Sequence, residues 1–241
     1  MPTLTEWRTF YDTWAGRDPR IASTGNVVPD ADFVRLGTVL TRWLDLRGDE
    51  QVLDVGCASG TLTSQWAGRA ARGIGVDFSS KLVAAANERH AGSNLSFETA
   101  EAAQLPFPDA SFDCVVCFNV LLSLPDHDYV WRAISEIQRV AKPDARIVLG
   151  SLPDTRCQER FFEILQTGAT WWRRWGSRVK SWLRPRRPRS TKILWFDVQS
   201  LKRQLERAGW RVEVHDDPPF ANYRYYRKSL VLSRSAPRVS R

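Results

Sequence analysis

The stretch QVLDVGCASG, residues 51–60, has the pattern of a buried strand that ends in a glycine-containing turn. Its short aliphatic run before the turn is typical of a parallel strand that is covered on both faces. Gly56 and Gly60 allow positive φ angles and let a ligand approach the bare backbone. Ligands of open α/β sheets bind beyond the carboxyl ends of the strands, so this stretch predicts a ligand site followed by a helix from Thr61. Asp54 could accept a hydrogen bond there from a hydroxyl or an ammonium group.

A second acidic residue follows another short apolar strand, at residues 72–77. Asp77 ends that strand and lies 21 residues after Gly56. An acid at about this spacing is placed to accept hydrogen bonds from both ribose hydroxyls of an adenosine ligand. The spacing between the glycine turn and Asp77 fits a nicotinamide cofactor equally well. However, the turn lacks G-x-G-x-x-G spacing and has Ala58 where a pyrophosphate requires glycine. The residues therefore favour a smaller, cationic adenosyl ligand.

Four ordered motifs resemble those of the class I S-adenosylmethionine-dependent methyltransferases, including the members that act on small molecules and glycans. They are DVGCASG at 54–60, GVDFS at 75–79, LPFPDASFD at 105–113 and VAKP at 140–143. The resemblance implies an α/β fold with a Rossmann-like, seven-stranded, mostly parallel sheet whose last strand is antiparallel. It further implies helices on both faces, a helical insert between strands 5 and 6, S-adenosyl-L-methionine as cofactor and S-adenosyl-L-homocysteine as product.

The resemblance also implies which residues contact the cofactor. At the matching positions, Glu101 accepts from the adenine amino group, the Ala102 backbone N–H donates to the ring, and Leu82 lies under it. For Glu101, a solvated acid in a polar loop is the alternative interpretation. Tyr11 belongs to an aromatic segment that resembles the one closing over the methionyl end. The expected cofactor-binding residues are Tyr11, Asp54, Gly56, Cys57, Ala58, Gly60, Asp77, Phe78, Leu82, Glu101, Ala102 and Asn119.

The residues after the fourth predicted strand, 112–118, are expected to face the transferred methyl group. Many small-molecule members of the resembled family have a histidine pair at this point, whereas this sequence has Leu122 and Ser123. A hydroxyl acceptor needs a base to remove its proton, and His127 and His215 are the candidate catalytic residues. A histidine that opens a helix is often only a solvated cap, which leaves a second interpretation of His127 open.

A chain of 241 residues suits one α/β domain with an elaboration. Ser79 is expected to cap the helix after the second strand, and another helix is expected from Trp131. The fifth strand is expected over residues 145–149, after a turn at 142–144 and with His215 beside it. We expect an N-terminal helical cap over 1–45, a cofactor-binding core over 46–153 and 195–235, and a basic, tryptophan-rich helical insert, a lid, over 154–194. No stretch reaches the ~18 apolar residues of a transmembrane helix, and the N-terminus is charged where a signal peptide is apolar. These features predict a cytoplasmic protein.

Two cysteines, Cys114 and Cys117, lie three residues apart in one predicted strand. Residues at this spacing in a strand face opposite sides of the sheet, so we expect two buried thiols rather than a zinc site, a redox pair or a disulfide. No metal is expected.

The net charge of +8 belongs to one segment, because residues 173–189 contain seven arginines, one lysine and no acid. Residues 156–166 and 171–183 read as two helices, and Trp171, Trp175 and Trp182 share one apolar face of the second. Three interpretations stay open. The segment could be a lid over the pocket, or residues 171–189 could contact anionic lipid and hold the protein at the periphery of the inner membrane. Nucleic acid is the least favoured partner, because no RNA-binding module is recognisable.

Two features of the sequence indicate the class of methyl acceptor. They are the size of the insert and a carboxyl-terminal segment that resembles the one in methyltransferases of glycan and secondary-metabolite pathways. Both favour O-methylation of a sugar, a glycan or another small molecule. The alternatives are C-methylation of a membrane-associated, quinone-type ring, and a non-catalytic membrane-surface or RNA-binding protein on the same fold.

Overall fold

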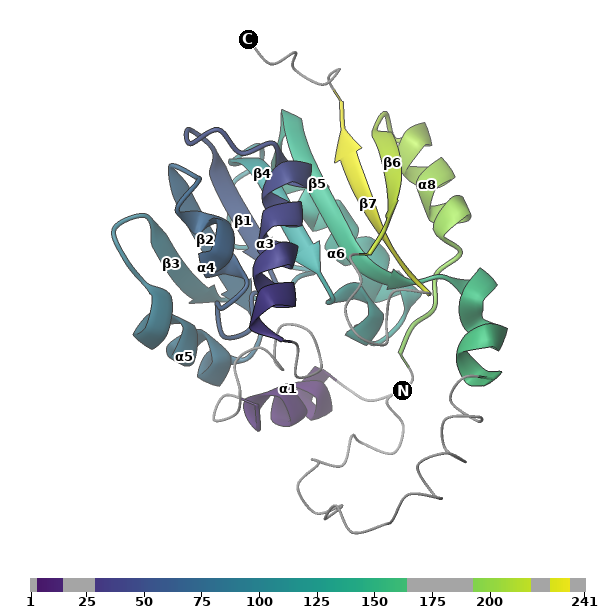
Figure 1. Ribbon diagram of the computed structural model, residues 1–241, viewed down its shortest axis with the longest axis horizontal. Coiled ribbons are helices and arrows are strands. Elements are labelled where there is room, and N and C mark those ends of the chain that lie inside the picture. The colour runs from purple at the N-terminus through teal and green to yellow at the C-terminus, as the bar shows by residue number, and fades with distance from the viewer. Residues whose placement is uncertain (1–3, 15–28, 164–192, 218–225, 235–241) are drawn as a thin grey trace.

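The computed structural model describes residues 4–14, 29–163, 193–217 and 226–234 (Figure 1). Its centre is a seven-stranded sheet in the order β3-β2-β1-β4-β5-β7-β6. Neighbouring strands are parallel except at β7, which is antiparallel to both β5 and β6. The strands are β1 (Gln51–Val55), β2 (Arg72–Asp77), β3 (Leu95–Thr99), β4 (Phe112–Phe118), β5 (Ala141–Pro153), β6 (Arg211–Asp216) and β7 (Arg227–Ser233). The predicted Rossmann-like sheet with an antiparallel last strand is confirmed.

Helices cover both faces of this sheet, as predicted (Figure 1). One face packs against α3, α4 and α5, and the other against α6 and α8. The helices with described bounds are α1 (Leu4–Asp12), α3 (Asp30–Leu44), α4 (Thr63–Ala67), α5 (Ser80–His90), α6 (His127–Val140) and α8 (Val198–Arg207), with 3-10 turns η1 (Leu121–Ser123) and η2 (Thr155–Cys157).

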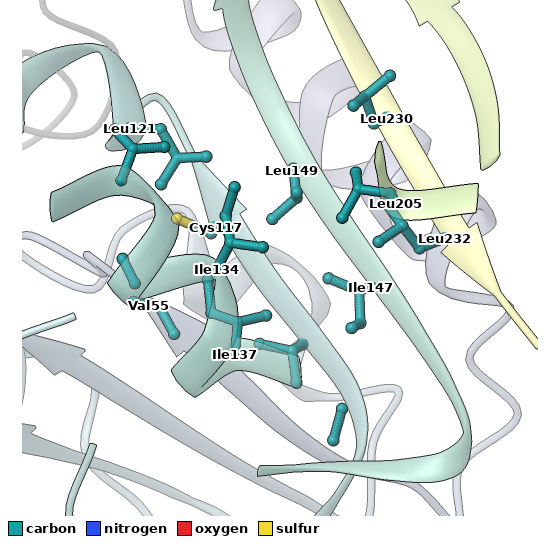
Figure 2. Close-up of a cluster of buried hydrophobic side chains, with 14 of the residues drawn as sticks. Val55, Cys117, Leu121, Ile134, Ile137, Ile147, Leu149, Leu205, Leu230 and Leu232 are labelled. Carbon is teal, nitrogen blue, oxygen red and sulfur yellow. The ribbon is translucent and has the colours of Figure 1, made fainter. Parts of the chain in front are cut away.

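The core on the α6 face is built from alternate residues of the strands (Figure 2). Ile147 and Leu149 of β5 meet Ile134 and Ile137 of α6, and all four are fully buried. The residue between those two strand positions, Val148, faces the α3 side instead. This alternation follows from the period of two in a strand, and it makes the sheet a two-sided platform whose ends are left for ligands.

The two cysteines of β4 follow the same alternation. Cys114 is buried in the cluster under α3, and Cys117 in the cluster under α6. The prediction that these thiols face opposite sides of the sheet is confirmed.

Side-chain caps set the starts of three helices. Ser79 accepts from the Leu82 N–H at the start of α5, as predicted, and Asp126 and Asp197 do the same for α6 and α8. The Asp126 cap starts α6 at His127, four residues before the predicted start at Trp131. The helix after the glycine turn likewise begins at Thr63 rather than Thr61, because the turn continues through residues 61–62.

Two predictions about the sheet were wrong. The fifth strand was expected over residues 145–149 after a turn at 142–144, but β5 already pairs with β4 at Ala141 and extends to Pro153. His215 was expected beside the fifth strand. In the structure β7 lies between β5 and β6, because β7 runs antiparallel and pairs with both, so His215 lies on an edge strand.

Part of the predicted insert lies outside the described residues. After β5 the chain forms η2 and then a helix over 158–163, whereas the predicted helix was 156–166. The predicted helix at 171–183 and the basic segment at 173–189 fall in the undescribed range 164–192. The division into cap, core and insert stays a prediction. Within the described residues, no helix combines the length and the apolar character needed to cross a bilayer.

Candidate active site

A pocket lies at the carboxyl edge of the parallel strands and encloses about 740 Å³ of space, including its opening. Its wall is contributed by α1, by the segments that follow β1 to β4, and by the start of α6. The lining residues are Trp7, Tyr11, Val55, Gly56, Ala58, Val76, Asp77, Phe78, Ala100, Glu101, Ala102, Phe118, Asn119, Val120, Ser123, Leu124 and Tyr129.

The glycine turn after β1 forms the floor of this pocket. Gly56 has a φ of 82°, and a Cβ atom placed on it would lie 2.2 Å from the Cγ2 atom of Val120. Only glycine therefore fits between the turn and the segment after β4. Ala58 is also left-handed, with a φ of 51°. The N–H groups of Gly56 and Cys57 both donate to the Val76 carbonyl, which ties the turn to the end of β2.

Asp77 is buried at the end of β2 and is held by two backbone bonds. One carboxylate oxygen accepts from the Ala58 N–H at 3.0 Å and the other from the Ser79 N–H at 2.9 Å. Burial raises the pKa of Asp77 to about 6, although these bonds oppose the shift. Each oxygen accepts one backbone bond and keeps a second lone pair, so the carboxylate has the capacity to accept from two hydroxyl groups of a ligand.

Asp54 lies behind the pocket wall. Its carboxylate accepts from the Thr63 hydroxyl at 2.6 Å. Burial, and to a smaller extent the negative charge of Asp77, raise the pKa of Asp54 to about 7. Two neighbouring buried carboxylates that repel each other are stabilised by a positive charge nearby, so this half of the pocket favours a cationic ligand.

Glu101 lies at the other end of the pocket, after β3. It accepts from Arg8 at 3.1 Å and from the Tyr129 hydroxyl at 3.3 Å. Burial and the Glu101 charge raise the pKa of Tyr129 to about 12, so this phenol stays protonated and donates. These two bonds hold the carboxylate of Glu101 at the pocket wall, but its side chain is 40% exposed, so the alternative of a solvated acid stays open.

Helix α1 closes the pocket from above the turn. The Tyr11 hydroxyl donates to Ser123 Oγ at 3.0 Å, and Asp12 accepts from the Ser79 hydroxyl at 2.5 Å. Trp7 and Phe10 of α1, with Trp14 just after the helix, pack in one buried cluster with Ala58 and Leu82. Of these three aromatic residues, Trp7 also lines the pocket.

Most of the predicted cofactor residues are brought together by the fold. Those that line the pocket are Tyr11, Gly56, Ala58, Asp77, Phe78, Glu101, Ala102 and Asn119. The other four, Asp54, Cys57, Gly60 and Leu82, do not line it. Leu82 is fully buried against α1, and the Gly60 position abuts Phe97. Their expected contacts with a cofactor stay predictions.

The two predicted catalytic histidines do not line the pocket. His127 packs edge-on against Phe196, with ring centroids 5.5 Å apart. His215 lies against Trp43 at 5.1 Å and near Glu213 on the α3 face. Sequence reasoning missed Trp7, Leu124 and Tyr129 as wall residues, because nothing in the local pattern indicates that α1, η1 and α6 meet.

In the part of the chain that the structure describes, no group of three or more histidine, cysteine or acidic side chains is arranged to hold a metal ion.

Comparison with known proteins agrees with this geometry. Residues 53–149 match the family model described as a methyltransferase domain. The chain is 36% identical over 121 residues to 27-O-demethylrifamycin SV methyltransferase of Amycolatopsis mediterranei, which covers 48% of this chain and 43% of the relative. It is 34% identical over 111 residues to demethylmenaquinone methyltransferase of Lactobacillus johnsonii, covering 43% and 44%. The chain thus spans less than half the length of these two relatives.

Among solved structures, magnesium protoporphyrin IX methyltransferase from Synechocystis PCC 6803, with bound S-adenosylhomocysteine, has the same fold. The TM-score is 0.66 at 22% sequence identity, and the alignment covers 97% of this chain and 100% of that one. Residues 53–149 therefore match a methyltransferase domain, and the chain as a whole has the fold of a solved methyltransferase.

Proposed function

We propose that the protein transfers the methyl group of S-adenosyl-L-methionine to a small molecule. The observation that carries this proposal is the row of polar groups along the carboxyl edge of the sheet: Glu101 after β3, Asp77 after β2 and the glycine turn after β1. Adenine, ribose and the amino-acid end of the cofactor would follow each other along this row. The sulfonium would then lie near the buried Asp54 and Asp77 carboxylates, whose negative charge in the ionised form would balance its own.

The bound cofactor supplies an activated methyl group on a sulfonium, and its leaving group is neutral. Little acid catalysis is needed, so the residues of this chain act mainly by alignment and by excluding water. Trp7 and Tyr11 would cover the ligand from α1, while Phe118, Val120 and Leu124 supply an apolar wall on the acceptor side.

For the acceptor, we favour an oxygen of a sugar, a glycan or another small secondary metabolite. The name of the Amycolatopsis relative, a 27-O-demethylrifamycin methyltransferase, supports an oxygen acceptor. For such an acceptor His127 and His215 stay candidate bases from the sequence alone, since neither lines the pocket. The second candidate acceptor is a quinone-type ring carbon, favoured by the demethylmenaquinone relatives and by an acceptor-side wall with no histidine among the described lining residues.

Calorimetry with S-adenosylhomocysteine tests the cofactor, and mass spectrometry of acceptor pools incubated with labelled S-adenosylmethionine tests the reaction. We expect 1:1 binding and a product heavier by one methyl group. Absence of S-adenosylhomocysteine binding would contradict the proposal and would favour a non-catalytic membrane-surface or RNA-binding protein. If binding occurs, acid-stable label on a ring carbon rather than on oxygen would select the quinone-type acceptor.

A further inference from the structure

A buried arginine at the start of β7 links the ends of two neighbouring strands. Arg227 is only 6% exposed, and its Nη1 atom donates to Asn119 Oδ1 at 2.6 Å and to Ser151 Oγ at 2.7 Å. Asn119 directly follows β4, and Ser151 lies near the end of β5. Arg227 comes from a strand outside residues 53–149, the region that matches the methyltransferase domain.

Both acceptors of this arginine have left-handed backbone, with φ of 61° at Asn119 and 64° at Ser151. Such conformations in residues other than glycine cost about 1 to 3 kcal/mol, persist only where the surroundings impose them, and cluster at active sites. Arg227 is part of those surroundings. Ser151 is held further by its N–H, which donates to Ser229 Oγ at 3.2 Å, and Ser229 in turn donates to the buried Asp217 at 2.5 Å.

The chemistry of the contact determines how the Asn119 amide is oriented. A guanidinium group has only donors, so the amide must turn its oxygen toward Arg227 and its amino group away from it. Asn119 lines the pocket, and the adjacent Val120 packs on the glycine turn. In the ligand order proposed above, the amino-acid end of the cofactor lies at the glycine turn after β1, on which Val120 packs. The amino group of Asn119 would then face the place where a carboxylate is expected.

We propose that Arg227 is a positioning residue, which fixes the Asn119 amide so that its amino group donates to the carboxylate of the cofactor's amino-acid end. This inference rests on the proposed function and adds to it a residue that does not itself touch the ligand.

Two ligands that differ only at that end test the inference. S-adenosylhomocysteine has the aminocarboxylate, whereas 5′-methylthioadenosine keeps the adenosine and the thioether but lacks it. Calorimetry on Arg227→Gln should show about a fivefold to tenfold weaker affinity for S-adenosylhomocysteine and less than about a twofold change for 5′-methylthioadenosine. Arg227→Lys, which keeps the charge and donors, should restore part of the loss.

Asn119→Asp provides a second variant in case Arg227→Gln does not fold. Its carboxylate still accepts from Arg227 and tolerates the left-handed backbone, but it has no N–H to donate. We expect it to lose S-adenosylhomocysteine affinity selectively, and the double variant to be no weaker than Asn119→Asp alone. Equal losses for both ligands, no loss for either, or additive losses in the double variant would overturn the inference. If the unmodified protein bound neither ligand, the proposed function itself would be contradicted.

Discussion

At the scale of single residues, the site is dominated by buried carboxylates whose partners are mostly backbone N–H groups and hydroxyls. Asp77 accepts from Ala58 and Ser79, and Asp54 accepts from Thr63. Among the residues that the structure describes, neither acid forms an ion pair. Burial without a nearby cation raises the pKa values of both carboxyl groups. A bound cationic ligand would favour their ionised forms.

The first prediction concerns the ribose contacts of Asp77. Asp77→Ala should weaken S-adenosylhomocysteine binding at least tenfold, because two hydrogen bonds to a charged group are lost, each worth about 1.5 to 3 kcal/mol. Asp77→Asn keeps one carbonyl oxygen and should be intermediate. Calorimetry at pH 8, with circular dichroism to check folding, measures both. A folded Asp77→Ala protein with an unchanged dissociation constant would remove Asp77 from the cofactor site.

The second prediction concerns pH and Asp54. Its folded pKa of about 7 is raised above the ordinary 3.8, so the stability gained from its protonated form is fully present below about pH 4 and is lost as pH rises through about 7. Asn cannot ionise but still accepts from Thr63. The free energy of unfolding of Asp54→Asn should therefore rise relative to the unmodified protein between pH 5 and pH 8.

Urea unfolding of the two proteins at several pH values measures this difference, which has an upper limit of about 1.4 kcal/mol per pKa unit. Parallel pH profiles for the two proteins would show that Asp54 is not perturbed as the structure indicates.

At the scale of elements, α1 forms one wall of the pocket through Trp7 and Tyr11. It is attached by two kinds of contact. Trp7, Phe10 and Trp14 are buried on the apolar side, while Arg8 pairs with Glu101 although both side chains are more than a third exposed. An exposed ion pair contributes only about 0.2 to 1 kcal/mol, so packing must supply most of the closure.

The third prediction follows from that difference. Trp7→Ala should speed dissociation of S-adenosylhomocysteine by about tenfold, because the ligand loses apolar wall area worth roughly 25 cal/mol per Å². Arg8→Ala, the matched control on the same helix, should change the rate by less than about threefold. Surface plasmon resonance measures both rates. Equal rates for Trp7→Ala and the unmodified protein would mean that α1 does not cover the bound ligand.

At the scale of the whole molecule, the excess positive charge and the pocket residues belong to different parts of the sequence. The described lining of the pocket includes two acids, Asp77 and Glu101, and no basic residue. The net charge of +8 comes from residues 173–189, which lie outside the described residues. A partner of this basic segment is therefore expected to be independent of the cofactor. The membrane contact of residues 171–189 stays a prediction of the sequence alone.

The fourth prediction tests that contact. The protein should sediment with vesicles that contain phosphatidylglycerol but not with neutral ones, since each basic residue near an anionic bilayer contributes about 1 kcal/mol. Binding should fade between 0.1 and 1 M salt, as the Debye length falls from ~10 to ~3 Å. Neutralising Arg184, Arg186, Arg187 and Arg189 should abolish sedimentation and leave S-adenosylhomocysteine affinity intact. Equal recovery in the supernatant with both vesicle types would favour a lid.

The sequence by itself determined the parts of the molecule that depend on neighbouring residues. The glycine turn after β1, the acid at the end of β2, the Ser79 cap and the opposite faces of Cys114 and Cys117 were all predicted. Each follows from local rules, namely backbone φ preferences, capping hydrogen bonds and the period of a strand.

Only the tertiary structure decided which distant residues meet. It placed β7 between β5 and β6, which put His215 on an edge strand against Trp43. It also brought Arg227 to Asn119, 108 positions away in the chain. No local pattern encodes such a contact, because it depends on the order of strands across the sheet. That order is selected by the burial of both faces of the sheet together rather than by any one segment.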